Sequence, residues 1–210
     1  MKLTKKLLYS FLAKILPAFI FISISLEVNA QAFEKEALDT IKELTLEQAL
    51  KIDPLKVYKL SLKKMKLNEL PEEIYNFKNL QALDASRNKL IYFPRKISIF
   101  PHLQELNFSN NKIPSIPEEL GLLTELKTLI LNQNELTSLP SEISNLKKLT
   151  FLDVWGNDIG FLPAEIELLS GSLKEIDMRV ILMSPEEHKK IKELLPETKI
   201  HFSKSCNCGF

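Results

Sequence analysis

Two cysteines near the C-terminus are the side chains with the clearest capacity for covalent chemistry. Cys206 and Cys208 are the two cysteines of the 210-residue chain, and one residue separates them. In an oxidising compartment they could form a disulfide, but a strained one, because residues two apart must bend to bring their Cα atoms within about 7 Å. Pairing with a second chain into a disulfide-linked dimer is the alternative. An exposed tail on a monomeric protein is the default expectation.

The three histidines do not form a metal-binding or catalytic set. His102, His188 and His201 are far apart in the sequence, and no carboxylate or thiol stands at ligand spacing from them. No phosphate-binding glycine loop, nucleophile elbow or paired-acid motif occurs, and the chain has only five glycines with which to build such loops. We therefore expect a protein that is not an enzyme and that uses no cofactor and no metal.

The most regular feature of the chain is a period of 23 residues. Five consecutive units begin at Val57, Leu80, Leu103, Leu126 and Leu149, and all five have apolar residues in the same seven columns. Two further columns are those of asparagine, at Asn88, Asn111, Asn134 and Asn157, and of proline, at Pro71, Pro94, Pro117, Pro140 and Pro163. Self-similarity at a fixed period of this size indicates a stacked repeat architecture.

Each unit predicts one strand and one return segment. In the fourth unit, alternation turns Leu129 and Leu131 inward, whereas Thr128, Ile130 and Asn132 face outward from the same sheet. Successive strands then stack in parallel, and the rest of each unit supplies the crossover that parallel strands need. We expect the proline at the first position of a return helix. The asparagine amide should satisfy backbone groups left unpaired where the strand turns away, which makes the asparagine column a structural ladder.

With its L-x-x-L-x-L-x-x-N-x-L-x-x-L-P-x-x-I pattern, the chain resembles the leucine-rich repeat family, and in particular short exported bacterial members with 23-residue repeats. The resemblance extends from Val57 to about Phe202. It implies an α/β solenoid: a horseshoe with a parallel concave sheet, short helical or 3-10 convex segments, and helical caps at both ends.

The flanking segments predict the domain organisation. Residues 31–56 form an N-terminal cap, with a helix expected from Phe33 to Leu44 and a capping box at Thr45–Gln48. The five repeats occupy 57–172, and 173–202 hold a degenerate sixth repeat and the C-terminal cap. In that cap we expect a helix from Ser184 to about Leu195 and a last strand at 198–202. The tail with Cys-x-Cys is 203–210.

Residues 1–30 have the composition of a secretory signal. Four lysines precede an apolar run from Ile15 to Leu26, and Val28-Asn29-Ala30 predicts cleavage after Ala30. The run is too short to span a bilayer comfortably, so no stable membrane span is expected after cleavage, although an uncleaved anchor is the alternative. The signal predicts a secreted, periplasmic or cell-surface protein.

Cleavage after Ala30 would also change the charge of the protein. It leaves 28 − 4 = 24 basic and 27 − 1 = 26 acidic residues, a net charge of −2. This slightly negative net charge disfavours nucleic-acid binding.

On the concave sheet, the third, fifth, seventh and eighth positions of each unit are expected to face outward. Phe151 and Trp155 should share one face of a strand, with Ile130 on the neighbouring strand about 5 Å away. Basic residues should lie toward the N-terminal end of this face and acidic ones toward the other end. The residues expected to contact a partner are Asp84, Arg87, Ile130, Asn132, Phe151, Asp153, Trp155 and Arg179.

An exposed aromatic cluster with a polar rim is typical of protein interfaces, where tryptophan is enriched. We therefore expect an exported module that binds another protein through its concave sheet. Binding of a carbohydrate or cell-envelope polymer on the same face is the alternative, with Trp155 and Phe151 stacking on sugar rings beside Asp153. A repeat architecture provides a surface without specifying its ligand, so the partner itself is not predicted.

Overall fold

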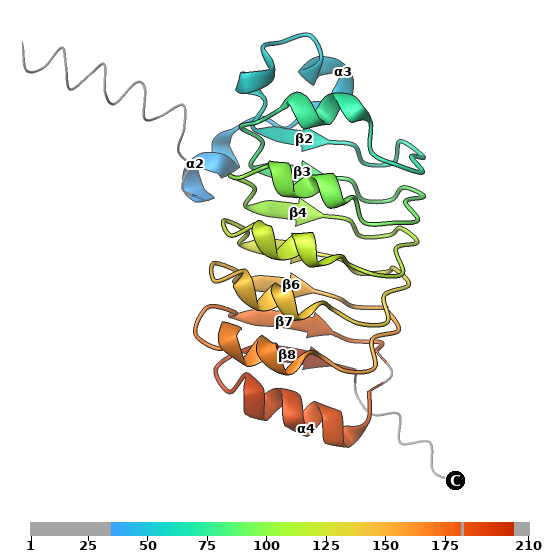
Figure 1. Cartoon of the computed structure of the whole chain (residues 1–210), viewed down its shortest axis with the longest axis vertical. Helices are drawn as coiled ribbons and strands as arrows, with labels where there is room; N and C mark the ends of the chain where they lie inside the picture. Colours follow the sequence, from blue (N-terminus) through green and yellow to red (C-terminus); the bar gives the residue numbers. More distant parts are fainter. Residues whose placement is uncertain (1–34, 182, 204–210) are drawn as a thin grey trace, which may run out of the picture. The chain divides into compact units, whose positions relative to one another are not determined.

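The computed structural model describes residues 35–181 and 183–203, which contain a single eight-stranded parallel sheet whose strand order follows the chain (Figure 1). The strands are β1 (Leu44–Thr45), β2 (Lys59–Ser61), β3 (Ala82–Asp84), β4 (Glu105–Asn107), β5 (Thr128–Ile130), β6 (Phe151–Asp153), β7 (Glu175–Met178) and β8 (Lys199–Phe202). This sheet, with one short return segment per repeat, confirms the predicted repeat solenoid.

The register of the sheet follows directly from the 23-residue period. Leu83 pairs with Leu106, which pairs with Leu129, so each residue lies beside its equivalent in the next repeat. Because side chains alternate between the two faces of a strand, identical leucines stack on one face through the sheet. These leucines are at most 2% exposed. A period of constant length thus keeps every apolar column inside.

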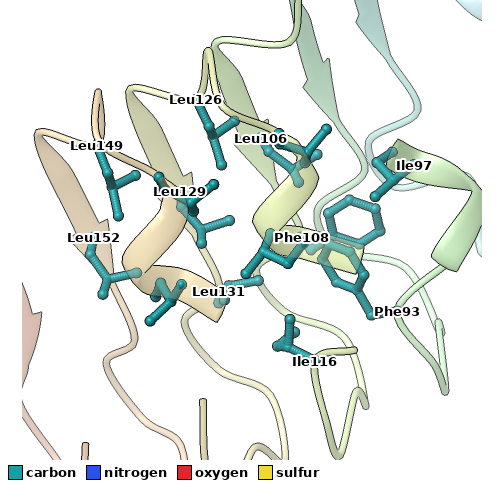
Figure 2. Close-up of a cluster of buried hydrophobic side chains, with 14 of the residues drawn as sticks. Phe93, Ile97, Leu106, Phe108, Ile116, Leu126, Leu129, Leu131, Leu149 and Leu152 are labelled. Carbon is teal, nitrogen blue, oxygen red and sulfur yellow. The ribbon is translucent and has the colours of Figure 1, made fainter. Parts of the chain in front are cut away.

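Short 3-10 helices run behind the sheet and close the core. They are η2 (Glu72–Asn76), η3 (Arg95–Ile99), η4 (Glu118–Leu122), η5 (Ser141–Asn145) and η6 (Ala164–Leu169). Figure 2 shows part of the core that they enclose, where the rings of Phe93 and Phe108 lie 5.0 Å apart, with Ile97 above them. The core is therefore a layer between one sheet face and the return segments.

The recurring prolines lie one residue earlier than predicted. Each of them is the N-cap residue of its 3-10 helix rather than its first helical residue. Pro140, for example, has an extended backbone with φ −71° and ψ 151°, and its carbonyl accepts a hydrogen bond from the Ile143 N–H at 3.1 Å. The prediction was wrong by one position because proline fixes φ, which extended and helical residues share, but not ψ, which separates them.

The asparagine column lies at the points where the strands turn into the return segments. The Asn134 amide nitrogen donates to the Phe108 carbonyl at 3.0 Å and to the Leu131 carbonyl at 2.9 Å, and its Oδ1 accepts from the Ile113 N–H at 3.1 Å. Asn88, Asn111 and Asn157 make equivalent bonds. Each asparagine therefore joins its own repeat to the preceding one.

The N-terminal segment differs from the expected single helix. Helix α2 (Lys35–Thr40) ends four residues before Leu44, and β1 pairs in parallel with β2, with Leu44 beside Leu60. The capping box at Thr45 is confirmed, with both reciprocal bonds present, and it starts helix α3 (Leu46–Ala49). Helix η1 (Pro54–Lys56) follows. The predicted helix was too long because pairing with β2 gives Leu44 a place in the sheet.

The C-terminal segment follows its sequence signals closely. Helix α4 (Pro185–Leu194) begins after Ser184, whose side chain accepts from the Glu187 N–H at 3.1 Å, as predicted. Strand β8 then pairs with β7 at the end of the sheet. The His188 and Phe202 rings stack with their centroids 4.0 Å apart, which ties α4 to β8.

Several sequence predictions concern the unplaced segments. The predicted signal sequence (1–30) and both cysteines, Cys206 and Cys208, lie outside the described residues. Within residues 35–181 and 183–203, no helix is both long and apolar enough to cross a membrane. The same residues contain no group of three or more histidine, cysteine or acidic side chains placed to hold a metal ion.

Candidate functional site

The sheet has one face that the return segments do not cover, and we call it the open face. It corresponds to the predicted concave sheet and carries the third and fifth residues of each repeat, with the seventh just beyond the strand. Three residues expected to face outward are nevertheless buried: Ala82 at 6%, Ser86 at 2% and Ser109 at 7% exposure. Their prediction as exposed residues was wrong because short side chains are covered by longer neighbours.

Fifth-position side chains close a turn at the ends of four strands. One carboxylate or amide oxygen of Asp84, Asn107, Asp153 and Asp177 accepts the N–H two residues further on, at 2.8 to 3.1 Å. Aspartate and asparagine favour such local turns because their short side chains reach this N–H. This role was not predicted from the sequence, although the recurrence of aspartate and asparagine in one column was the available signal.

The apolar cluster of Ile130, Phe151 and Trp155 is half-buried rather than fully exposed. Ile130 on β5 lies beside Asp153 on β6, and Phe151 lies beside Thr128. The expectation of an exposed cluster was therefore too strong. Ile130 and Phe151 lie on two neighbouring strands of the open face, and Trp155 follows just after the second of them.

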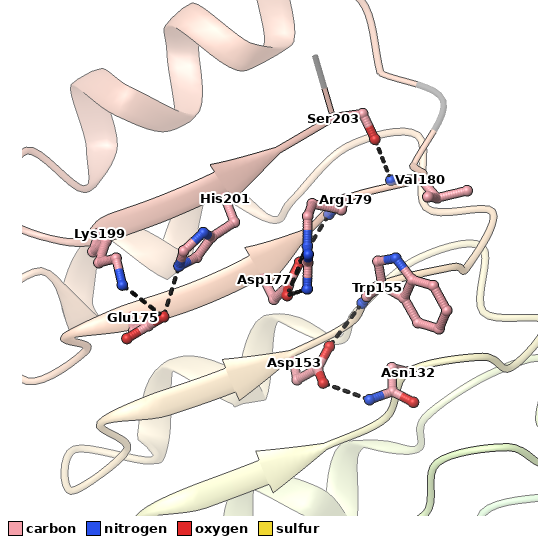
Figure 3. A network of polar contacts seen from close by, with 10 residues as sticks. All are labelled: Asn132, Asp153, Trp155, Glu175, Asp177, Arg179, Val180, Lys199, His201 and Ser203. Atoms are coloured by element: carbon pink, nitrogen blue, oxygen red, sulfur yellow. Dashed lines mark hydrogen bonds and ion pairs between the residues drawn. The ribbon is translucent and has the colours of Figure 1, made fainter.

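Asn132 and Asp153 form a polar pair near Trp155 (Figure 3). The Asn132 side-chain amide donates to one oxygen of Asp153, and the backbone N–H of Trp155 donates to the other at 3.1 Å. Burial raises the pKa of the Asp153 carboxyl above its ordinary value, although both hydrogen bonds act against this. No ion pair joins Asp153 to a cation among the described residues, so its charge is not compensated by direct contact.

The acidic residues nearer the C-terminal end of the sheet are paired within the chain. Arg179 contacts Asp177 at 2.6 Å, and Glu175 lies 3.1 Å from Lys199 and 2.6 Å from His201 (Figure 3). The contacts with His201 and Lys199 hold the pKa of Glu175 below its ordinary value. Burial acts to raise the pKa of Asp177, but the bonds from Arg179 together outweigh it.

These pairs alter the predicted charge distribution. An acidic C-terminal end was expected, but Asp177 is paired with Arg179 and Glu175 with Lys199. The guanidinium of Arg179, expected to meet a partner, is already engaged with Asp177. The sequence analysis placed a last strand at 198–202 but did not add Lys199 and His201 to the face.

The two remaining predicted residues lie on β3 and just beyond it, three strands away from Trp155. Asp84 is half-buried and lies 3.7 Å from the Lys63 ammonium. Arg87 is exposed, and its backbone has a positive φ of 57°. The structure therefore brings Ile130, Asn132, Phe151, Asp153 and Trp155 together, and it separates Asp84 and Arg87 from them.

A hollow of about 180 Å³ lies on the open face, and its lining includes Asp84 and Ile130, one residue from each of these groups. Its lining comes from strands β2 to β5 and from the segment before β1. The lining residues are Glu43, Lys59, Ala82, Leu83, Asp84, Glu105, Leu106, Asn107, Thr128 and Ile130. Sequence reasoning missed this hollow, although Ala82 stood out as the smallest residue in the third-position column.

Comparison with known proteins points to one family. Residues 101–159 match the family model described as leucine rich repeat. A leucine-rich repeat protein of Leptospira interrogans is 34% identical, with a TM-score of 0.63 over 82% of this chain and 40% of that one. The present chain thus spans about two fifths of the length of that protein. No curated protein sequence is significantly similar.

Two plant structures are also similar. The leucine-rich repeat ectodomain of the Arabidopsis thaliana membrane receptor kinase GASSHO1/SCHENGEN3, in complex with Casparian strip integrity factor 2, is 30% identical. Its TM-score is 0.59, over 70% of this chain and 18% of that one. The BIR3–SERK2 complex of the same plant gives 36% identity and a TM-score of 0.50, over 56% of this chain and 65% of that one. With its 23-residue units, its asparagine column and its parallel sheet, the chain belongs to the leucine-rich repeat family.

Proposed function

We propose that this protein is a non-enzymatic, exported interaction module that binds a protein partner through the open face of its sheet, centred on Trp155. The observation that carries the proposal is the position of Ile130, Phe151 and Trp155 on the open face beside Asp153, whose carboxylate has no ion pair among the described residues. Large apolar side chains next to polar ones on an otherwise open face are typical of binding sites. Tryptophan is enriched among residues that dominate binding energy.

The family relationship supports protein binding. Leucine-rich repeat proteins generally mediate protein–protein interactions and typically are not enzymes. Two of the similar structures are complexes. The side chains of the open face come from several short strands held by one core, so the surface is preorganised for a partner.

Export is supported by the composition of residues 1–30 and by the similarity to the ectodomain of a membrane receptor. The proposal therefore places the partner outside the cytoplasm, as a released protein or one exposed on a cell surface.

Carbohydrate binding on the same face is a second candidate. Trp155 and Phe151 offer rings that could stack on a sugar, and the Asn132–Asp153 pair offers hydrogen-bonding groups for its hydroxyls. A glycan array probed with the native protein and with the Trp155→Ala variant distinguishes protein binding from carbohydrate binding. If the open face binds sugars, the native protein should bind glycans on the array and the variant should not.

Photocrosslinking tests the protein-binding proposal. A photoreactive phenylalanine derivative replaces Thr128, which lies beside Phe151. This substitution leaves Trp155 intact. Matched controls carry it at Glu73 and Glu165, two exposed residues of the return helices. The protein is mixed with cell surfaces and medium of the organism that produces it.

We expect one protein to be captured from position 128 and not from positions 73 and 165. Adding Trp155→Ala to the position-128 protein should lower capture about tenfold or more, as for a dominant interface residue. Equal capture from all three positions, or capture that ignores Trp155, would contradict the proposal.

A further inference from the structure

The hollow on the open face owes its shape to one short side chain. Ala82 lies between Lys59 and Glu105 in the register of the sheet, so a methyl group stands between two long side chains. Glu43 closes one end of the hollow, and Thr128 and Ile130 close the other. The floor is therefore apolar and the walls carry the charges.

The charges that line the hollow do not balance. Three carboxylates, those of Glu43, Asp84 and Glu105, face one ammonium group, that of Lys59. No hydrogen bond or ion pair joins the side chain of Glu43 or Glu105 to any other described residue. Asp84 has a cation, Lys63, at 3.7 Å. This differs from the C-terminal end of the face, where Asp177 and Glu175 have cations of their own at 2.6 to 3.1 Å.

The hollow adjoins the apolar cluster of Ile130, Phe151 and Trp155. Thr128 and Ile130 form one wall of the hollow, and they lie beside Phe151 and Asp153 of the next strand. Ala82 and Phe151 are three strands apart, which corresponds to about 14 Å at the spacing of neighbouring strands. An extended peptide covers that distance in about four residues.

We infer that the open face takes an extended segment of a partner protein that places a lysine or arginine side chain in the hollow and an apolar side chain on Phe151 and Trp155, about four residues away. The charged end would meet Glu43 and Glu105, and its aliphatic stem would cover Ala82, as long basic side chains do on apolar surface. This inference rests on the proposed function, since it names the chemistry of the partner for the same face.

Synthetic peptides supply the test. The probe is a fluorescent nine-residue peptide of serine, threonine and glycine, with arginine at its third position and leucine at its seventh. A second peptide replaces arginine by citrulline, which keeps the shape but lacks the charge. A third moves leucine to the fifth position. Fluorescence anisotropy gives their affinities for the full protein at low salt, where exposed charges are least screened.

The protein variants separate the two contacts. Glu43→Gln with Glu105→Gln removes two charges of the hollow with little change in shape. Its matched control, Glu73→Gln with Glu165→Gln, removes two charges from exposed residues of the return helices. Trp155→Ala removes the apolar contact. Circular dichroism establishes that each variant is folded.

We expect the native protein and the control variant to bind the arginine peptide about fivefold more tightly than the citrulline peptide, the effect of two largely exposed charge pairs. This preference should disappear in the Glu43→Gln/Glu105→Gln protein. Trp155→Ala should lower the affinity for the arginine and citrulline peptides by the same factor, so that the preference for arginine remains. The peptide with leucine at its fifth position should bind the native protein less tightly than the peptide with leucine at its seventh.

Three results would overturn the inference: no difference between arginine and citrulline, a difference that survives loss of Glu43 and Glu105, or no binding of any peptide. These results leave the proposed function standing if position 128 still captures a protein in a Trp155-dependent way. Failure of that capture, in contrast, removes the proposed function itself.

Discussion

The two faces of the same strands follow different rules. On the inner face of β5, Leu129 lies between Leu106 and Leu152, so this buried leucine has a leucine on both sides. On the open face of the same strand, Ile130 lies between Asn107 and Asp153, and Thr128 lies between Glu105 and Phe151. The inner face repeats because packing requires it, whereas the open face varies because solvent tolerates many side chains. Binding specificity can therefore differ without a change of fold.

A second contrast runs along the open face. Toward its C-terminal end Asp177 and Glu175 have ion pairs within the chain, whereas Glu43, Glu105 and Asp153 have none among the described residues. The carboxylates of Asp177 and Glu175 are engaged within the chain, whereas those of Glu43, Glu105 and Asp153 are available for an ion pair with a partner.

Neighbouring residues of β5 give the strongest test of the first contrast. Leu129 is fully buried, so Leu129→Ala should lower the free energy of unfolding by about 2–5 kcal/mol through lost burial and the cavity left behind. Ile130→Ala, one residue later on the open face, should cost about 1 kcal/mol or less. Urea unfolding followed by circular dichroism measures both. Similar losses in the two variants would mean that the faces do not differ as described.

The asparagines offer a polar version of the same test. Asn134→Ala leaves buried backbone groups without their partners and should cost about 1–3 kcal/mol of unfolding free energy. Asn132→Ala, two residues earlier on the open face, removes a bond to Asp153 and should cost about 0.5–1.5 kcal/mol. The same urea titration compares them, and a larger loss for Asn132→Ala would contradict the structural role of the asparagine column.

A pair of glycines tests how closely the return helices pack. A Cβ atom at Gly121 would lie 2.7 Å from the Glu142 carbonyl oxygen, so Gly121→Ala should destabilise the protein by about 1–3 kcal/mol. At Gly160 a Cβ atom would meet nothing within 4 Å, so Gly160→Ala should be neutral or stabilising by up to about 1 kcal/mol. Thermal unfolding of both variants is the measurement. A stable Gly121→Ala protein would show that η4 and η5 can separate without loss.

The smallest expected effect concerns the charge of Asp153. Burial raises the pKa of its carboxyl in the folded protein, so the folded state binds a proton more readily than the unfolded state. Stability contributed by this group therefore increases as pH falls through the folded pKa toward the ordinary value of 3.8. Relative to Asp153→Asn, the native protein should gain stability between pH 7 and pH 4.

Urea unfolding of both proteins at several pH values measures that difference. Asp177 and Glu175 have lowered pKa values and the opposite pH dependence, but they are present in both proteins and largely cancel in the comparison. A difference that does not change with pH would contradict the effect of burial on Asp153.

Much of the fold could be predicted because it follows from regular spacing. The period placed Leu106, Leu129 and Leu152 on one face, and Ser184 with Pro185 marked the start of α4. The expected helix up to Leu44 was wrong because Leu44 pairs with Leu60 of β2, and local sequence does not reveal such a pairing. The prolines were misplaced by one residue because φ alone does not separate a cap from a first turn.

The open face was predictable only in part. Sequence spacing identified which columns face outward and singled out Trp155, Phe151 and Ile130. It did not reveal that Arg179 is engaged with Asp177, that Ser86 and Ser109 are covered, or that Glu43 approaches Ala82. Those facts depend on side chains from different repeats or on a segment outside the repeats.

The sequence by itself determined the repeat unit, the parallel stacking and the identity of the buried columns, because a constant period of 23 residues forces equivalent residues into register. Only the tertiary structure decided which charges pair, which small residues lie hidden, and where a hollow remains. The reason is physical: burial of apolar columns follows from periodicity along the chain, whereas charge compensation and surface shape depend on how long side chains from neighbouring strands share the space between them.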